Sequence, residues 1–179
     1  MNAGPPEHPG MEKTVRTTFP TSVSAADMDA AAQDYIQRGW TVAETANGLC
    51  LITDENVSAI EIGGELAGEV RRFLRANNLT GPVIEVPGAE RREIHLVTGV
   101  RKAAMALDAL REAGATVYTD GAGVPLPPSK LSAGSASWGV APREARWVPP
   151  VVAIAAAVRS AASGKRAQLT GAQLTSVAC

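Results

Sequence analysis

The sequence predicts an α+β domain with a mixed, largely antiparallel sheet and flanking helices. Short segments rich in Val, Ile and Leu occur in groups between isolated helical segments, and they do not alternate one for one with helices as in a doubly wound sheet. Turn sequences such as "TANG" and "TDEN" separate the first strands by only a few residues, which favours antiparallel neighbours. With 179 residues, of which 45% are hydrophobic, the chain is long enough for one domain with its own core.

The first half of the predicted domain contains one helix and three strands. The helix is expected in "SAADMDAAAQDYIQRG", because Ser24 suits the N-cap position and Gly39 suits the end of a helix. The segments "WTVAE", "GLCLIT" and "VSAIEI" follow as short strands. Their close spacing predicts a three-stranded meander.

The second half continues with helices and short runs of strands. A helix is expected in "GELAGEVRRFLRAN", where apolar residues recur at helical spacing. The later elements follow in this order: strands in "GPVIEVP" and "REIHLVTG", a helix that Gly114 ends, one or two strands in "ATVYTDGAGVPLPP", a short strand at Trp138, and a helix in "PPVVAIAAAVRSAASG".

These elements divide the chain into three parts. Residues 1–22 are rich in Pro, Gly and Thr and are expected to form a disordered N-terminal arm. Residues 23–162 contain the α+β domain. Residues 163–179, which end at Cys179, carry little periodic apolar content and are expected to form a flexible tail.

The segment "GVPLPPSKLSAGSASW" places three prolines within four positions and a Gly/Ser-rich bend after them. Proline fixes φ and removes a backbone donor, so this segment is expected to be an ordered loop of extended or polyproline-like conformation. Such a loop can serve as a preformed binding surface, and it can equally be a stiff connector between two strands.

Composition restricts the function classes. The net charge is −1, so any basic surface for nucleic acid must be local. Two cysteines form neither a disulfide framework nor a metal-ligand spacing. The longest apolar run, "VVAIAAAV", is far shorter than the roughly 18 residues of a membrane span. The N-terminus lacks the pattern of a signal peptide. We therefore expect a cytoplasmic protein without a membrane partner.

The order of elements and a few marked segments resemble a known family. The marked segments are "YIQRGW", "GLCLITDENVSAIEIGG", "REIHLVTG" and "VYTDGAGVPLPPSKLSAGSASW". Over about residues 25–160 they resemble the N-terminal domain of bifunctional DNA primase-polymerases (prim-pol), in the archaeo-eukaryotic primase superfamily. The resemblance implies a primase/polymerase-like α+β fold, with the Pro-Pro-Ser loop beside a nucleotide site.

The resemblance also implies a candidate catalytic set. The family carries two acids one residue apart on a strand, a histidine on another strand and a later acid, which hold two divalent metals for nucleotidyl transfer. The matching positions here are Glu61 and Gly63, His95, and Asp120. Glu61 and Asp120 are the candidate ligands for Mg²⁺ or Mn²⁺, and the three side chains must share one sheet face. Because Gly63 has no side chain, the set is incomplete.

The same resemblance suggests nucleotide-binding residues, listed here: Arg91, Arg92, His95, Ser129 and Lys130. The resulting hypothesis is a degenerate prim-pol-like domain that binds nucleotide or nucleic acid without efficient polymerase activity. Two alternatives remain open. One is an active metal-dependent nucleotidyltransferase of the DNA primase/polymerase type, and the other is a regulatory protein-interaction module that keeps only the fold.

Overall fold

The computed structural model describes Met1 and residues 23–175, with side chains described as far as residue 164. The predicted N-terminal arm, apart from Met1, and the terminal Cys179 lie outside the described residues. The helices are α1 (Ala25–Gln37), α2 (Gly64–Ala76), the short 3-10 turn η1 (Val100–Lys102), α3 (Ala104–Glu112) and α4 (Val151–Thr175). The strands are β1 (Val42–Thr45), β2 (Gly48–Ile52), β3 (Ser58–Gly63), β4 (Val83–Val86), β5 (Arg92–Val97), β6 (Thr116–Tyr118), β7 (Gly123–Leu126), β8 (Lys130–Leu131), β9 (Gly134–Ser135) and β10 (Ser137–Val140).

Three antiparallel sheets organise the described chain. The largest has five strands in the order β10-β4-β5-β3-β6, a second has the order β1-β2-β7, and β8 and β9 form a small ribbon. All the strand pairs within these sheets are antiparallel. The predicted α+β class with a largely antiparallel sheet and flanking helices is therefore confirmed.

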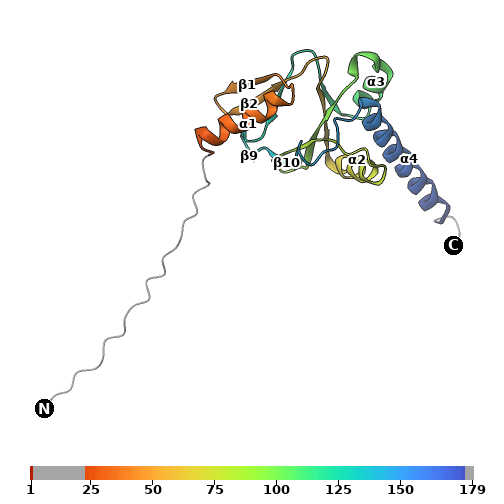
Figure 1. Ribbon diagram of the computed structural model, residues 1–179. Coiled ribbons are helices and arrows are strands. Elements are labelled where there is room, and N and C mark those ends of the chain that lie inside the picture. The colour runs from red at the N-terminus through yellow and green to blue at the C-terminus, as the bar shows by residue number, and fades with distance from the viewer. Residues whose placement is uncertain (2–22, 176–179) are drawn as a thin grey trace.

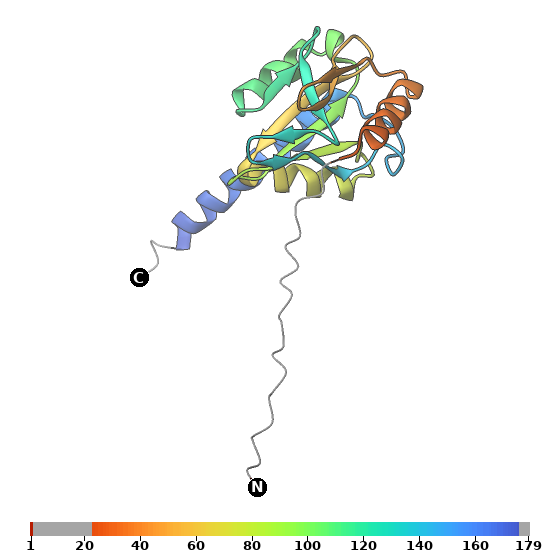
Figure 2. The same cartoon turned by 90° about the vertical axis from the view of Figure 1, so that its left-hand side faces the viewer.

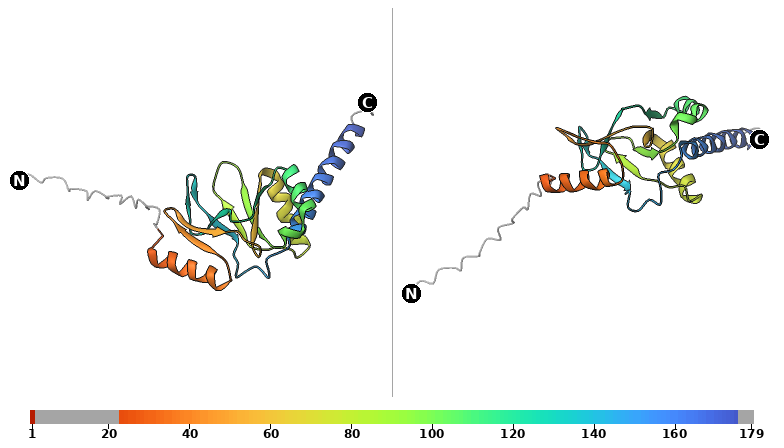
Figure 3. Two further views of the ribbon diagram at one scale, coloured as in Figure 1. Left: turned by 90° about the horizontal axis from the view of Figure 1, so that it is seen from above. Right: turned by 45° about the horizontal axis from the view of Figure 1, so that its top comes forward.

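The five-stranded sheet forms the middle layer of the domain. Helices α2, α3 and α4 cover one face, while α1 and the three-stranded sheet lie on the other side (Figure 1, and Figure 3, left). Each face has its own apolar core. Ile60, Ile62 and Val97 point to the helical layer, whereas Ile94 and Leu96 point to the opposite core.

The predicted three-stranded meander is wrong in its third strand. β1 and β2 form a hairpin, but the next neighbour of β2 is β7, and β3 lies in the five-stranded sheet. The turn at Asp54 redirects the chain, because its side chain accepts hydrogen bonds from the backbone of Asn56 and Val57. β3 can then bury residues on both of its faces between β5 and β6.

An aromatic cluster fastens α1 to the rest of the domain. Tyr35 stacks on Trp40 and meets the edge of Trp138, with ring centroids 5.6 and 6.0 Å apart. The Trp138 indole donates to the Tyr35 hydroxyl at 3.0 Å, and that hydroxyl donates to the Pro127 carbonyl. Trp138 lies on β10, as predicted, so this cluster connects α1, the proline segment and the sheet edge.

The proline segment is a stiff connector. Pro125 lies within β7, at the edge of its sheet, where a missing N–H is tolerated. The peptide bond between Pro127 and Pro128 is cis. The following Ser129 is buried, and its hydroxyl accepts a hydrogen bond from the Leu49 amide at 2.9 Å. The serine thus joins the proline turn to β2.

Helix α4 extends further than predicted. Its first turns are buried between α2 and α3, but the helix continues through Gly164 to Thr175, into the expected flexible tail (Figures 1 and 2). The tail residues include Ala, Lys, Arg, Gln and Leu, which propagate a helix once buried turns have started it. Among the described residues, no helix combines the length and apolar character needed to cross a membrane.

We expect Gly48→Ala to destabilise the fold by about 3 kcal/mol. Gly48 has φ +132°, and an added Cβ would lie 2.6 Å from both the Pro128 carbonyl oxygen and the Ser129 Oγ. Urea unfolding measures the loss. Gly68→Ala is the control, because nothing lies within 4 Å of its Cβ and it lies in helix α2. Equal stability of Gly48→Ala and the parent chain would contradict this account.

Candidate functional site

Strand β5 carries two polar residues into the interior. Glu93 and His95 alternate with Ile94, so they point to the helical layer while Ile94 points to the opposite core. Their exposed fractions are 0% and 2%. Register places Glu85 of β4 directly opposite Glu93, so both carboxylates lie on the same face.

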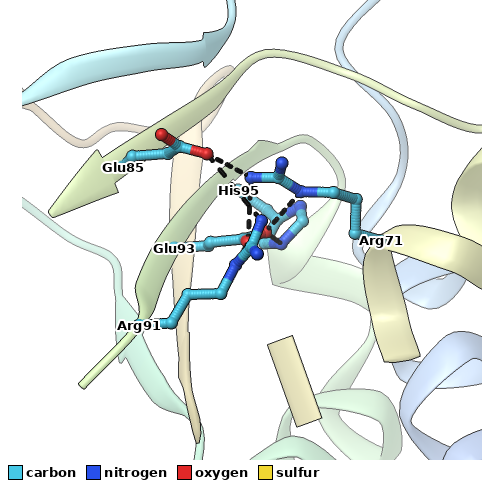
Figure 4. Close-up of polar contacts among 5 residues, drawn as sticks. All are labelled: Arg71, Glu85, Arg91, Glu93 and His95. Carbon is cyan, nitrogen blue, oxygen red and sulfur yellow. Dashed lines mark hydrogen bonds and ion pairs between the residues drawn. The ribbon is translucent and has the colours of Figure 1, made fainter. Parts of the chain in front are cut away.

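Two arginines compensate these carboxylates from two different segments. Arg71 of α2 lies 2.6 Å from a Glu85 oxygen and 2.9 Å from a Glu93 oxygen. Arg91, immediately before β5, donates its Nε–H to Glu93. Figure 4 shows these groups converging between α2 and the sheet. We refer to Arg71, Glu85, Arg91, Glu93 and His95 as the buried ion cluster.

The cluster keeps Glu93 ionised. Burial alone would raise the pKa of Glu93, but His95, Arg91 and Arg71 together outweigh it and lower the pKa to about 2. The His95 Nε2 lies 3.6 Å from a Glu93 oxygen, just beyond hydrogen-bonding distance, and has no hydrogen-bond partner among the described residues. The network is therefore held together mainly by the two arginines.

Glu61 belongs to a different ion pair on the opposite face of the sheet. Its carboxylate lies 2.9 Å from the Arg92 Nε and accepts a hydrogen bond from the Tyr118 hydroxyl at 2.6 Å. Burial first, and then the nearby Glu61 carboxylate, raise the pKa of Tyr118 to about 12. A guanidinium and a phenol, rather than a second carboxylate, therefore surround Glu61.

The expectation that Glu61, His95 and Asp120 share one face is wrong. Glu61 is paired with Ile94, and His95 is paired with Ile60, so the side chains of Glu61 and His95 leave opposite faces of neighbouring strands. Asp120 is an exposed turn residue with φ +55°, between β6 and β7. Within the described part of the chain, no group of three or more His, Cys, Asp and Glu side chains is placed to hold a metal ion.

The predicted binding residues separate into two sets. Ser129 and His95 are buried, and the Ser129 hydroxyl is used by the backbone of β2, so neither side chain is exposed at the surface. Arg91 and Arg92 are half exposed and line a cavity of about 370 Å³ at the β4–β5 hairpin. We call this the hairpin cavity; its lining residues are Glu85, Val86, Pro87, Gly88, Glu90, Arg91, Arg92, Ser135 and Ser137.

Lys130 adjoins the same place. It is exposed and lies directly opposite Ser135 in the β8–β9 ribbon, and Ser135 lines the hairpin cavity. Cross-strand partners share a face of the ribbon, so the Lys130 side chain leaves the same face as that of Ser135. Arg91 and Arg92 thus line the hairpin cavity, and Lys130 is the cross-strand partner of one of its other lining residues, Ser135.

Sequence reasoning missed Arg71, Glu85 and Glu93. The signal for Glu93 was present, because "REIHLV" places Glu and His at alternate positions between apolar residues. A strand with that pattern carries a polar face, and a buried polar face requires partners. The identity of the partners depends on how α2 packs, which no local pattern encodes.

Comparison of the chain with family models, with curated proteins and with solved structures finds no match. The prim-pol resemblance accordingly rests on the residues of this chain.

The buried carboxylate of Glu93 should make the stability of the fold depend on pH in the acid range. The folded-state pKa of Glu93, about 2, lies below its ordinary value of 4.5. Glu93 therefore stabilises the fold above pH 4.5, and that contribution is lost as the pH falls from 4.5 towards 2. We expect Glu93→Gln to lower the free energy of unfolding at neutral pH by about 3 kcal/mol. Between pH 4.5 and 2, the free energy of unfolding of this variant should depend less steeply on pH than that of the parent chain.

Urea unfolding at a series of pH values measures both effects. Glu85→Gln is the matched control, since it removes a half-exposed carboxylate from the same cluster. The free energy of unfolding of Glu85→Gln should still fall steeply as the pH is lowered. An identical pH dependence in Glu93→Gln and the parent chain would contradict the assignment.

Proposed function

We propose that this domain binds phosphate groups of a nucleotide or of single-stranded nucleic acid in the hairpin cavity, without efficient nucleotidyl transfer. The observation that carries the proposal is the pair of half-exposed arginines, Arg91 and Arg92, on the wall of one cavity. Arginine side chains present several donors in a planar fork that matches phosphate oxygens. Ser135 and Ser137 line the same cavity, and serine hydroxyl groups can donate further hydrogen bonds to phosphate.

Arg91 and Arg92 can each bind a ligand without leaving the carboxylate that they now pair with unpaired. If Arg91 engages a phosphate, Glu93 keeps its ion pair with Arg71. If Arg92 does so, Glu61 keeps the hydrogen bond from the Tyr118 hydroxyl. Exchange of partners therefore avoids the large cost of an uncompensated buried charge.

Acidic neighbours limit the affinity. Glu85 and Glu90 line the same cavity, so its charge is close to balanced. Binding then depends on a few phosphate contacts and the counterions that they release. The proposal is a weak, salt-sensitive binding function, and we place it in the cytoplasm, inside a degenerate prim-pol-like fold.

We expect micromolar or weaker affinity for ATP and for a short thymidine oligonucleotide at low salt. Arg92→Ala and Lys130→Ala should each weaken binding by about fivefold, because each removes one charge-assisted contact. The slope of log affinity against log salt should become shallower by about one unit in each variant. Calorimetry with ATP and fluorescence anisotropy with the labelled oligonucleotide provide the measurements.

Arg101→Ala is the matched control. Arg101 is an exposed arginine paired with Glu55, and it does not line the hairpin cavity. Its removal should leave the affinity unchanged. Absence of binding at low salt, or equal affinity of the parent chain and both test variants, would favour the alternative of an interaction module.

For the enzymatic alternative, we expect no incorporation of labelled nucleotide on a primed template with Mg²⁺ or Mn²⁺. Glu61 is engaged by Arg92 and Tyr118, Gly63 offers no carboxylate, and Asp120 lies in an exposed turn. Primer extension is the measurement. Robust incorporation that disappears in Glu61→Ala would establish the nucleotidyltransferase function instead.

A further inference from the structure

Helix α3 presents an exposed apolar patch beside α4. Met105 is 88% exposed, and Val152 of α4 is 50% exposed. Both line a cavity of about 610 Å³ between the two helices, together with Ala109, Lys102 and Arg159. Methionine adapts its shape to an opposing surface and is common at protein contact sites.

Charges of opposite sign lie at the two ends of this patch. Lys102 precedes α3 and lines the cavity, and Glu112 is the last residue of the helix. Met105, Ala109 and Glu112 are spaced by four and three residues, so they lie along one helical stripe. Neither Lys102 nor Glu112 has an ion-pair or hydrogen-bond partner for its side chain among the described residues.

This arrangement is complementary to itself. Met105 and Ala109 each lie two residues from position 107 within α3, and Lys102 of η1 and Glu112 at the end of α3 each lie five residues from it along the sequence. When two copies of α3 pack antiparallel about a twofold axis at that position, Met105 meets Ala109 of the partner subunit. Lys102 then faces Glu112 of the partner subunit, and the same contacts recur on the other side of the axis.

We propose that α3 forms the centre of a twofold-symmetric homodimer interface, with Met105 in the middle and two Lys102–Glu112 pairs at its ends. A purely acidic partner would attract Lys102 and Arg159 but would face repulsion at Glu112, and a purely basic partner would attract only Glu112. A second copy pairs Lys102 and Glu112 at once. The interface does not use the hairpin cavity, so it is independent of phosphate binding.

The contact is small. Stable interfaces bury about 1,200–2,000 Å² in total, and α3 has only nine residues. The dimer is therefore reversible, with micromolar affinity. Sedimentation velocity over a series of protein concentrations measures it.

Met105→Glu should leave the chain monomeric, because it places two carboxylates at the centre of the interface. The exposed Met105 contributes little to the fold, and circular dichroism checks that the variant remains folded. Ile36→Glu is the matched control: Ile36 is 55% exposed on α1, and its variant should dimerise like the parent chain.

Charge reversal gives the decisive comparison. Lys102→Glu and Glu112→Lys should each weaken dimerisation by about tenfold, since each converts two attractions into repulsions. The double variant K102E/E112K restores opposite charges across the axis and should recover most of the affinity. A parent chain that is monomeric at every concentration, dimerisation of Met105→Glu equal to the parent, or a double variant weaker than both single variants would overturn the proposal.

Discussion

The carboxylate of Glu93 is the constraint on which the centre of this structure depends. It is fully buried, and an isolated charge at such a depth would cost more free energy than a small domain can supply. Arg71 from α2 and Arg91 from the hairpin both pair with it. The compensation of this one charge therefore ties α2 and the segment before β5 to the same point of the sheet, in addition to the apolar contacts that α2 makes with the core.

The same requirement explains the hairpin cavity. Arg91 reaches inward to Glu93, while its neighbour Arg92 reaches to Glu61 on the other face of the sheet. Consecutive residues at the start of a strand point in opposite directions, so two ion pairs on two faces meet at one edge. The cavity mouth thus carries two arginines whose acid partners each have a second partner, Arg71 for Glu93 and Tyr118 for Glu61.

The domain keeps its two candidate interaction surfaces apart. The hairpin cavity lies at the β4–β5 turn, and the patch around Met105 lies on the helical layer between α3 and α4. They share no lining residue. A dimer formed through α3 would therefore leave the hairpin cavity of each copy outside the contact.

The sequence by itself determined the α+β class, most elements and the direction of single side chains. His95 between Ile94 and Leu96 had to face away from both, and Pro125 had to avoid a central strand, because these consequences follow from local backbone geometry. Only the tertiary structure decided which faces meet. The pairing of Glu61 with Ile94 places the side chains of Glu61 and His95 on opposite faces of the sheet, and β3 pairs with β5 instead of β2. The Ser129 hydroxyl forms its hydrogen bond with the backbone of Leu49. Strand register and helix packing bring together residues far apart in the chain, and their energies depend on partners that no local pattern specifies.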